Sequence, residues 1–540
     1  MMNTDPRFHD EEMADATQLV CDEMTRDLVL RMGCSKEAAQ LCGLAVGTQD
    51  SGSVCLGPLD ETDCEMLRAY PDVISDGGAS IAPFVLNRNL LYTRRNWLYE
   101  QTVRTRMQEM SAQILDSNVE VPSDGIFQNM EQRQREAIEM MCRRRFSLLT
   151  GGPGTGKTYT IARAVLLCRQ TDGTLRLGLA APTGKAAARV KEAMDKEANI
   201  LGLSDMPPAT TIHSLLQSNY DLVTFKYNKA NPLPLDWLIV DEASMIDLPL
   251  MAKLLDALPH DCRLTLVGDA HQLASVEPGR VFGDLCRMPG IPKCELNVSR
   301  RFPQGGEIER LATAVNTGDC ETVLSMLKMS SNKLLHYTSL AYFSPDTPKG
   351  WGDFAAVITE HFKTFANAES AEQALATLND CRILCAMRHG LYGMTRLNAF
   401  VKKLMGDDTP IPMMIVKNDH SLGVNNGDVG VVIPKLKDDS LHLPAPDGNI
   451  RSIPLALLPN TEMAFASTIH KAQGSEYKDV VIVLPPTSQM HDTKLDNPLL
   501  TREILYTAIT RTQKAVFLYG GDDSIRTCCA HAVKRQSGLA

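Results

Sequence analysis

The stretch LLTGGPGTGKT, residues 148–158, combines residue types and spacing that can bind phosphate. Gly151, Gly156, Lys157 and Thr158 have the spacing of a phosphate-binding loop, between an apolar strand-like run and the helical pattern YTIARAVLLC. In such a loop the backbone N–H groups converge on phosphate oxygens, and the helix N-terminus adds the positive end of its dipole. Lys157 would reach the β- and γ-phosphates, and the Thr158 hydroxyl would hold Mg²⁺. The loop therefore predicts a site for a nucleoside triphosphate and Mg²⁺.

Two acids and an amide follow later strand-like runs. Asp241 and Glu242 come directly after WLIV, where Asp241 could hold Mg²⁺ and Glu242 could orient or deprotonate a water. The alternative is a strand that ends in two solvated acids. Gln272, just beyond LTLVGD, could sense the γ-phosphate or the attacking water, although polar residues are common at strand ends. With the phosphate-binding loop upstream, the acid pair indicates nucleotide hydrolysis rather than binding alone.

Two arginines are candidates for neutralising the charge of a phosphoryl-transfer transition state. They are Arg301 in NVSRRF and Arg511 in LYTAITRTQ. Most arginines lie on protein surfaces, so either assignment needs further support.

The composition narrows the class of protein. Hydrophobic residues make up 44% and charged residues 22% of the 540 residues, as in ordinary globular proteins. No apolar run approaches a membrane span, and the first residues, MMNTDPRFHDEEMADA, lack the layout of a signal peptide. The 15 cysteines show no zinc-ligand spacing, which favours reduced thiols in a cytoplasmic protein. A net charge of −10 argues against a protein that coats nucleic acid, but not against a motor with a locally basic groove.

The elements that must position these residues alternate along the chain. Apolar strand-like runs and helical patterns follow each other in two groups, which predicts an α/β fold with two parallel-sheet domains. A segment with Gly-containing turns, such as NNGDVGVVI, is typical of a small antiparallel barrel. Before the VPSDG linker, two amphipathic helices and a strand pair that leads into a helix form a separate unit. The expected divisions are an N-terminal domain at 1–118, a first motor domain at 119–345, a second motor domain at 346–414 and 459–540, and the barrel insertion at 415–458.

A known order of motifs runs through the chain. Gln134 precedes the phosphate-binding loop, and APTGKAAARV, TIHSLL, IVDEASMID, VGDAHQLASVEPG, SRRF, FASTIHKAQGSEYKDVVIVLP and REILYTAITRTQKAVFLYG follow it. This order resembles that of superfamily 1 helicases and, more closely, the RecD family, the alpha subunits of exodeoxyribonuclease V (the RecBCD enzyme). The resemblance extends to LYTRRNWLYEQTV, IERLATAVNTGD, VNNGDVGVVI, PDGNIRSI and RQSGLA, and so covers nearly the full length.

The resemblance implies two RecA-like P-loop motor domains with parallel sheets, an SH3-like β-barrel insertion and a mostly helical N-terminal domain. It implies an ATP-dependent 5′-to-3′ DNA helicase that uses ATP and Mg²⁺, binds single-stranded DNA and duplex ends, and acts with RecB- and RecC-like subunits in double-strand break repair and recombination. It also implies a location in the bacterial cytoplasm. No cluster of carboxylates suggests a nuclease site, so nuclease chemistry would belong to a partner subunit.

The resemblance also implies roles for individual residues. The nucleotide would contact Gln134, Gly151, Gly152, Pro153, Gly154, Thr155, Gly156, Lys157, Thr158, Gly474 and Glu476. Single-stranded DNA would contact Thr183, Lys185, His213, Thr468, His470 and Lys471. Polar side chains and a few cations at these positions can hold phosphates without reading the base sequence. The two histidines could instead be hydrogen-bonded residues of the protein core.

The chain departs from the family pattern at one motif. The family usually has an aromatic residue before the arginine of the fourth motif, whereas SRRF offers Arg300 and Arg301. We favour Arg301 as the arginine finger because it is the arginine next to Phe302.

Two other functions remain open at this stage. One is a stand-alone RecD-like helicase that works without partners. The other is a scaffold subunit whose ATPase has decayed, although the intact catalytic residues argue against decay. The N-terminal domain contains no chemical motif and is either a docking surface for a partner or a stabilising cap.

Overall fold

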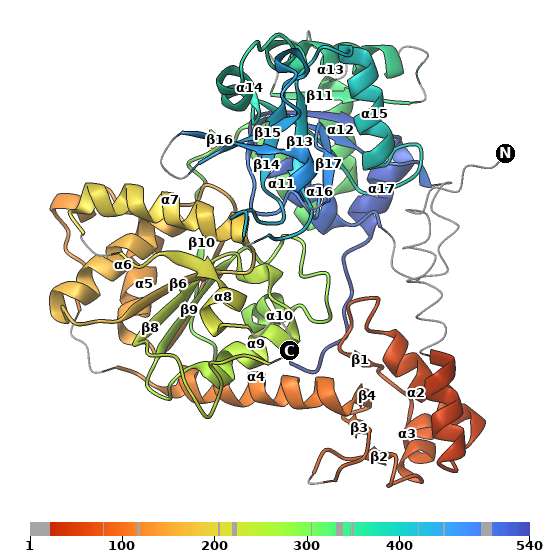
Figure 1. The fold of residues 1–540 in the computed structure, drawn as a ribbon. Coiled ribbons are helices and arrows are strands. Elements are labelled where there is room, and N and C mark those ends of the chain that lie inside the picture. Colours follow the sequence, from red (N-terminus) through yellow and green to blue (C-terminus); the bar gives the residue numbers. More distant parts are fainter. Residues whose placement is uncertain are drawn as a thin grey trace.

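The computed structural model describes residues 22–539, except 79, 116–118, 204–205, 219–223, 304, 331–338, 346, 348–349, 420, 446–448, 459 and 488–498. Two parallel sheets with helices around them form the centre of the molecule, and the N-terminal unit lies beside the first (Figure 1). This mixed α/β architecture confirms the expected fold class.

The first sheet carries the phosphate-binding loop. It has six parallel strands in the order β10-β5-β9-β8-β6-β7. Four of them, β5, β6, β8 and β9, are apolar runs that are almost wholly buried, as expected of strands covered by helices on both faces. The strands are β5 (Phe146–Gly151), β6 (Leu177–Ala181), β7 (Ala209–Thr211), β8 (Trp237–Val240), β9 (Arg263–Gly268) and β10 (Lys293–Leu296). The helices are α5 (Gln132–Arg143), α6 (Lys157–Thr171), α7 (Gly184–Leu201), α8 (Ile212–Leu216), α9 (Leu248–Ala257) and α10 (Val281–Arg287).

The second sheet has five parallel strands in the order β11-β20-β19-β12-β18. The strands are β11 (Leu340–Phe343), β12 (Cys381–Cys385), β18 (Ala466–Thr468), β19 (Tyr477–Val483) and β20 (Thr512–Tyr519). The helices are α11 (Glu307–Thr317), α12 (Cys320–Ser330), α13 (Gly350–Ala366), α14 (Ala371–Thr377), α15 (Met394–Met405), α16 (Arg502–Ile509) and α17 (Asp522–Ala530).

The change from the first domain to the second comes earlier than the expected position, 345. Strand β11 pairs with β20 of the second sheet, and Leu311 of α11 shares a buried cluster with Leu505 of α16. Residues from 307 onward therefore pack with the second domain. The sequence could not show this, because an amphipathic helix does not reveal which sheet its apolar face covers.

A small antiparallel sheet is inserted between α15 and β18. It contains β13 (Ile411–Ile415), β14 (Val429–Val432), β15 (Ser440–Pro444), β16 (Ile450–Pro454) and β17 (Thr461–Met463) in the order β16-β15-β14-β13-β17. Its first and last strands extend beyond the expected limits of 415 and 458. The pairings among the described residues leave β16 and β17 at its edges, so an SH3-like closure stays a prediction.

The N-terminal unit combines helices with a small sheet. Residues 22–31 are helical, and α2 (Lys36–Gly47), α3 (Glu61–Arg68) and α4 (Arg94–Ala112) follow. The part of the first expected helix before residue 22 lies outside the described residues. The expected strand pair is β3 (Phe84–Asn87) with β4 (Leu90–Thr93), to which the short strands β1 (Cys55–Leu56) and β2 (Ile74–Ser75) are added.

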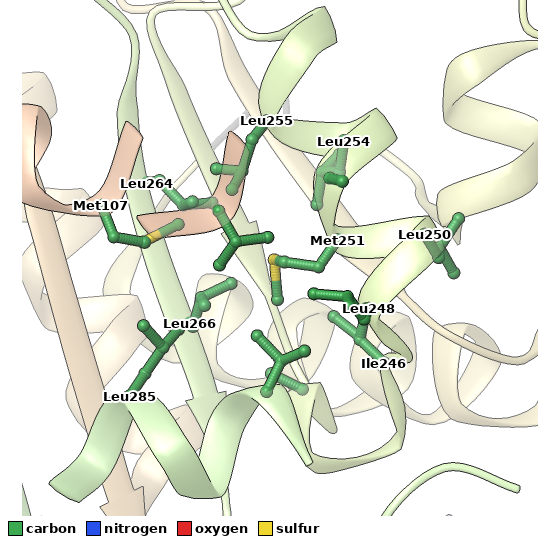
Figure 2. Close-up of a cluster of buried hydrophobic side chains, with 14 of the residues drawn as sticks. Met107, Ile246, Leu248, Leu250, Met251, Leu254, Leu255, Leu264, Leu266 and Leu285 are labelled. Atoms are coloured by element: carbon green, nitrogen blue, oxygen red, sulfur yellow. The ribbon is translucent and has the colours of Figure 1, made fainter. Parts of the chain in front are cut away.

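Helix α4 joins this unit to the first motor domain. Its Met107 is fully buried and points into a cluster formed by β9, α9 and α10, including Met251, Leu264 and Leu285 (Figure 2). Complete burial of such a side chain contributes about 1.5–3 kcal/mol. The N-terminal unit and the first motor domain therefore share a hydrophobic core.

The C-terminal segment returns to the same unit. It leaves the second motor domain after α17 and ends near α4 and α9 (Figure 1). The Val54 N–H donates to the Gln536 carbonyl over 2.8 Å, and the Gly538 N–H donates to Glu100 Oε2 over 2.9 Å. Leu539 is buried in the core that contains Met107. The chain end thus connects the second motor domain to the N-terminal unit.

Candidate nucleotide site and nucleic-acid groove

A cavity of about 370 Å³ lies where the phosphate-binding loop faces the second motor domain. Its lining includes all six candidate catalytic residues, which come from both domains: Lys157, Asp241, Glu242, Gln272, Arg301 and Arg511. It also includes Pro153, Gly154, Thr155, Gly156, Thr158 and Glu476 from the candidate nucleotide contacts. Gly151, Gly152, Gln134 and Gly474 do not line it.

The shape of the phosphate-binding loop depends on its glycines. Gly156 has a φ of 83° and is the N-cap of α6, so the helix N-terminus opens directly onto the loop. A Cβ on Gly154 would lie 2.4 Å from the Cβ of Arg301, so a larger residue would displace that arginine. Lys157 Nζ donates to the carbonyls of Gly151 and Gly152 over 2.7 and 3.1 Å. The lysine ammonium is thus held across the loop that would surround a phosphate.

Gln134 supports the loop from behind. Its side chain is buried, its Nε2 donates to the Thr155 carbonyl over 3.5 Å, and its Oε1 accepts from the Glu131 N–H over 3.2 Å. It therefore connects the first turn of α5 to the loop.

The two acids occupy the carboxyl end of β8. Asp241 Oδ1 accepts from the Glu242 N–H over 2.8 Å. Glu242 has a φ of 51°, a left-handed backbone conformation that is costly for a residue with a Cβ and is frequent at functional sites. Burial, reinforced by the charge of Glu242, raises the pKa of Asp241 to about 6. A carboxylate and the Thr158 hydroxyl are hard oxygen donors that suit Mg²⁺, and a cation would relieve the burial of this carboxylate.

The two neighbouring arginines of SRRF point to different places. The side chain of Arg301 lines the cavity, donates to the Thr510 carbonyl over 3.2 Å and pairs with Glu476. Burial and the nearby guanidinium groups of other arginines lower the pKa of Arg301 to about 9. Arg300 also lines the cavity but is 47% exposed, and its guanidinium lies 5.5 Å from the centre of the Tyr159 ring.

Arg511 approaches from the second domain. It is 2% exposed, and one of its terminal nitrogens donates to the Ser475 carbonyl over 3.4 Å. Its buried Nε has no hydrogen-bond partner among the described residues. An unpaired buried N–H donor is costly unless an acceptor reaches it, which fits a position that faces a phosphate.

A hydrogen-bond chain joins the two motor domains beside the cavity. Gln272 Nε2 and the Tyr506 hydroxyl both donate to Asp269 Oδ2, each over 3.1 Å. The Leu273 N–H donates to Thr507 Oγ1 over 3.0 Å, and Gln473 Nε2 donates to the Leu273 carbonyl over 2.8 Å. The segment that follows β9 is therefore hydrogen-bonded directly to the second domain.

Three polar residues near the nucleotide cavity were not expected from the sequence: Tyr159, Arg189 and Tyr506. Tyr159 and Arg189 line the cavity, and the Tyr506 hydroxyl would lie 3.3 Å from a Cβ on Gly152. Their positions carried some signal, because Tyr159 follows Thr158 directly and Arg189 lies one helical turn after Lys185.

A second cavity, of about 480 Å³, lies between the two motor domains and the inserted antiparallel sheet. Five of the six candidate DNA contacts line it, namely Thr183, Lys185, His213, His470 and Lys471, together with Asn418 and Asn426 from the inserted segment. Thr468 is not part of the lining, and its Oγ1 accepts from the Lys471 N–H over 3.4 Å.

Local caps position several of these side chains. Thr183 is the N-cap of α7 and accepts from the Ala186 N–H over 3.2 Å, which fixes the turn that carries Lys185. Neither His213 nor His470 is fully buried, so they are not core histidines. Partial burial lowers the pKa of both, which favours the neutral imidazole at neutral pH.

The described residues contain no group of three or more His, Cys, Asp or Glu residues that could hold a metal ion. No described helix is long and apolar enough to cross a membrane.

Comparison with known proteins places the chain among helicase sequences. The AAA domain family matches residues 134–278, and the UvrD-like helicase C-terminal domain family matches residues 463–519. The RecBCD enzyme subunit RecD of Mycolicibacterium smegmatis is 35% identical over 473 residues, covering 84% of this chain and 82% of that protein. The same subunit of Haemophilus influenzae is 33% identical, covering 75% and 71%. The ATP-dependent RecD2 DNA helicase of Deinococcus radiodurans is 30% identical over 407 residues, covering 72% of this chain and 49% of that protein.

Proposed function

This chain belongs to the RecD family of RecBCD enzyme subunits, and we propose that it moves 5′ to 3′ along single-stranded DNA while it hydrolyses MgATP in the first cavity. It is an ATP-dependent DNA helicase. The observation that supports the site most strongly is the convergence of six candidate catalytic side chains from both motor domains on one cavity.

Each of these side chains has a role in the proposal. Lys157 holds the β- and γ-phosphates, and Glu242 orients or deprotonates the attacking water. Asp241 and the Thr158 hydroxyl hold Mg²⁺, which draws charge from the phosphates when bound. Gln272 senses the γ-phosphate beside the interdomain hydrogen-bond chain.

The arginines complete the site from two sides. Arg301 and Arg511 neutralise the transition state, Arg511 from the second domain, so that hydrolysis requires the cleft to be closed. We further propose that Tyr159 and Arg300, which line the cavity side by side, flank the base. Gln134 positions the loop beside it.

Movement along DNA follows from closure and opening of the cleft. The second cavity would hold the single strand, with Thr183, Lys185 and His213 on the first domain and His470 and Lys471 on the second. Because the candidate contacts belong to two domains, a change in their separation moves one set along the strand relative to the other.

Partners are part of the proposal. The helix at 22–31, the turn that follows it and α2 expose large apolar side chains, namely Met24, Leu28, Leu30, Met32 and Leu44. An exposed apolar patch of this kind is typical of an interaction site. We therefore expect RecB- and RecC-like subunits to bind the N-terminal unit, to supply the nuclease site and to act with this chain in the bacterial cytoplasm.

Unwinding of tailed duplexes tests the motor and its direction together. The purified chain, with ATP and Mg²⁺ at low salt, should open a duplex with a 5′ tail and leave one with a 3′ tail intact; salt is kept low because it weakens phosphate contacts steeply. Lys157→Gln is the matched control, expected to fold normally and to unwind neither. Opening of only the 3′-tailed duplex would contradict the direction, and wild-type ATP turnover by Lys157→Gln would contradict the site.

Two alternatives have their own outcomes. A stand-alone helicase would unwind DNA at full rate without partners, and would not co-purify with RecB- and RecC-like subunits. A decayed scaffold would show no ATPase response to single-stranded DNA.

A further inference from the structure

Two short segments each run from the DNA-facing cavity to the nucleotide cavity. In α7, Lys185 lines the DNA-facing cavity and Arg189 lines the nucleotide cavity. The two residues are four positions apart on one helix, a rise of about 6 Å. In the segment before β19, Lys471 lines the DNA-facing cavity and Glu476 lines the nucleotide cavity. Each segment therefore has one cation in the groove and one charged residue beside the nucleotide.

The two segments meet at an ion pair between the motor domains. The guanidinium of Arg189, on the first domain, pairs with the carboxylate of Glu476, on the second. Close to this pair, a Cβ on Gly474 would lie 3.5 Å from the Cβ of Ala186, so the two backbones are in contact. A displacement of either segment by the DNA strand must therefore reach this ion pair.

Glu476 has a second guanidinium partner, Arg301, so the Arg189–Glu476 pair competes with a contact of a candidate catalytic residue. The same carboxylate oxygen that pairs with Arg189 also pairs with Arg301, and the other oxygen accepts from Gln513 Nε2 over 3.2 Å. A guanidinium held by a carboxylate is less available to a phosphate. The division of Glu476 between its two arginines therefore decides how free Arg301 is to meet the γ-phosphate.

We propose that Arg189 is a positioning residue that couples DNA binding to ATP hydrolysis by drawing Glu476 away from Arg301. In the DNA-free enzyme Glu476 is shared between Arg189 and Arg301. A strand bound at Lys185 and Lys471 brings α7 and the 471–476 segment together, which strengthens the Arg189–Glu476 pair and releases Arg301 toward the nucleotide. This inference rests on the proposed function of the two cavities.

The test is the ratio of the ATPase rate at saturating single-stranded DNA to the rate without DNA. Arg189→Ala should lower this ratio at least tenfold, while the dissociation constant for single-stranded DNA stays within about threefold of the wild-type value. The conservative variant Arg189→Lys should keep part of the stimulation. Lys191→Ala is the matched control, because it removes a cation from the exposed side of the same helix and should leave the ratio unchanged.

A double variant tests the route through Glu476. If Arg189 acts through this carboxylate, adding Glu476→Gln to Arg189→Ala should free Arg301 and raise the DNA-free rate above that of Arg189→Ala alone, whereas an unchanged DNA-free rate would contradict the route. Equal losses of the basal and stimulated rates in Arg189→Ala, or a stimulation ratio that survives while DNA affinity falls, would overturn the inference. A wild-type chain that shows no stimulation by DNA would instead refute the proposed function itself, so the two failures are distinguishable.

Discussion

The two arginines of SRRF allow a matched pair of substitutions at adjacent positions. Both arginines line the cavity, but Arg301 is mostly buried and bonded to the Thr510 carbonyl and Glu476, whereas Arg300 is half-exposed beside the Tyr159 ring. An arginine that stabilises the phosphoryl-transfer transition state is worth roughly 10³–10⁵ in kcat, or about 4–7 kcal/mol. We therefore expect Arg301→Ala to lower the DNA-stimulated kcat at least a thousandfold.

Arg300→Ala removes the same charge one residue away. An exposed cation–π contact is worth about 0.5–1 kcal/mol, which corresponds to a two- to fivefold rise in the KM for ATP with little change in kcat. The assay is steady-state ATP hydrolysis at saturating single-stranded DNA, with kcat and KM determined separately for both variants. The reverse result, a collapse of kcat in Arg300→Ala and a small effect in Arg301→Ala, would refute the assignment of the arginine finger.

Three further perturbations test other parts of the structure. In a urea titration, Met107→Ala should lower the free energy of unfolding by about 2–4 kcal/mol, because it opens a cavity in the core shared by α4 and the first motor domain. The control Leu98→Ala, on the exposed side of α4, should change that free energy by less than about 0.5 kcal/mol. Glu100→Ala should cost about 2–4 kcal/mol, because Tyr92 and the C-terminal backbone lose a buried acceptor; an unchanged unfolding midpoint would contradict this. Because burial raises the pKa of Asp241 to about 6, protons compete with Mg²⁺ as pH falls through that value. The Mg²⁺ concentration for half-maximal ATPase should therefore be constant between pH 7 and 8 and rise by up to about tenfold per unit below 6, and a flat profile from 8 to 5 would contradict the role of Asp241.

The sequence was sufficient to predict those site residues whose position depends on a single strand and the loop that follows it. The loop that ends in Lys157 and the acid Asp241 each follow a buried apolar strand directly, and the carboxyl ends of parallel strands meet at one edge of a sheet. Arg511 could be placed near them only through the family resemblance, because its cavity position depends on how two domains pack. The pairing of Arg189 with Glu476 had no sequence signal at all, since the two residues are far apart in the chain and either could have been a solvated surface charge.

The same limit explains what was missed at the ends of the chain. The sequence predicted that the N-terminal unit is a separate body with a docking or capping role. Amphipathic patterning in α4 could not reveal that its apolar face packs into the cluster that contains α9 and α10. Nor could RQSGLA reveal that Gly538 would bond to Glu100, more than four hundred residues away.

The N-terminal unit is connected to both motor domains, and these two connections restrict how the domains can move relative to each other. Helix α4 shares a core with the first motor domain, so the unit must travel with that domain. The C-terminal segment leaves the second domain, and its Arg535 donates to the carbonyls of Ser275, Glu277 and Gly279 before the chain reaches Glu100. Opening of the nucleotide cleft must therefore bend the short segment between α17 and Arg535, because both of its ends are fixed to different domains. A partner bound to the N-terminal unit would accordingly follow the first domain through the ATPase cycle, while the second domain moves relative to both.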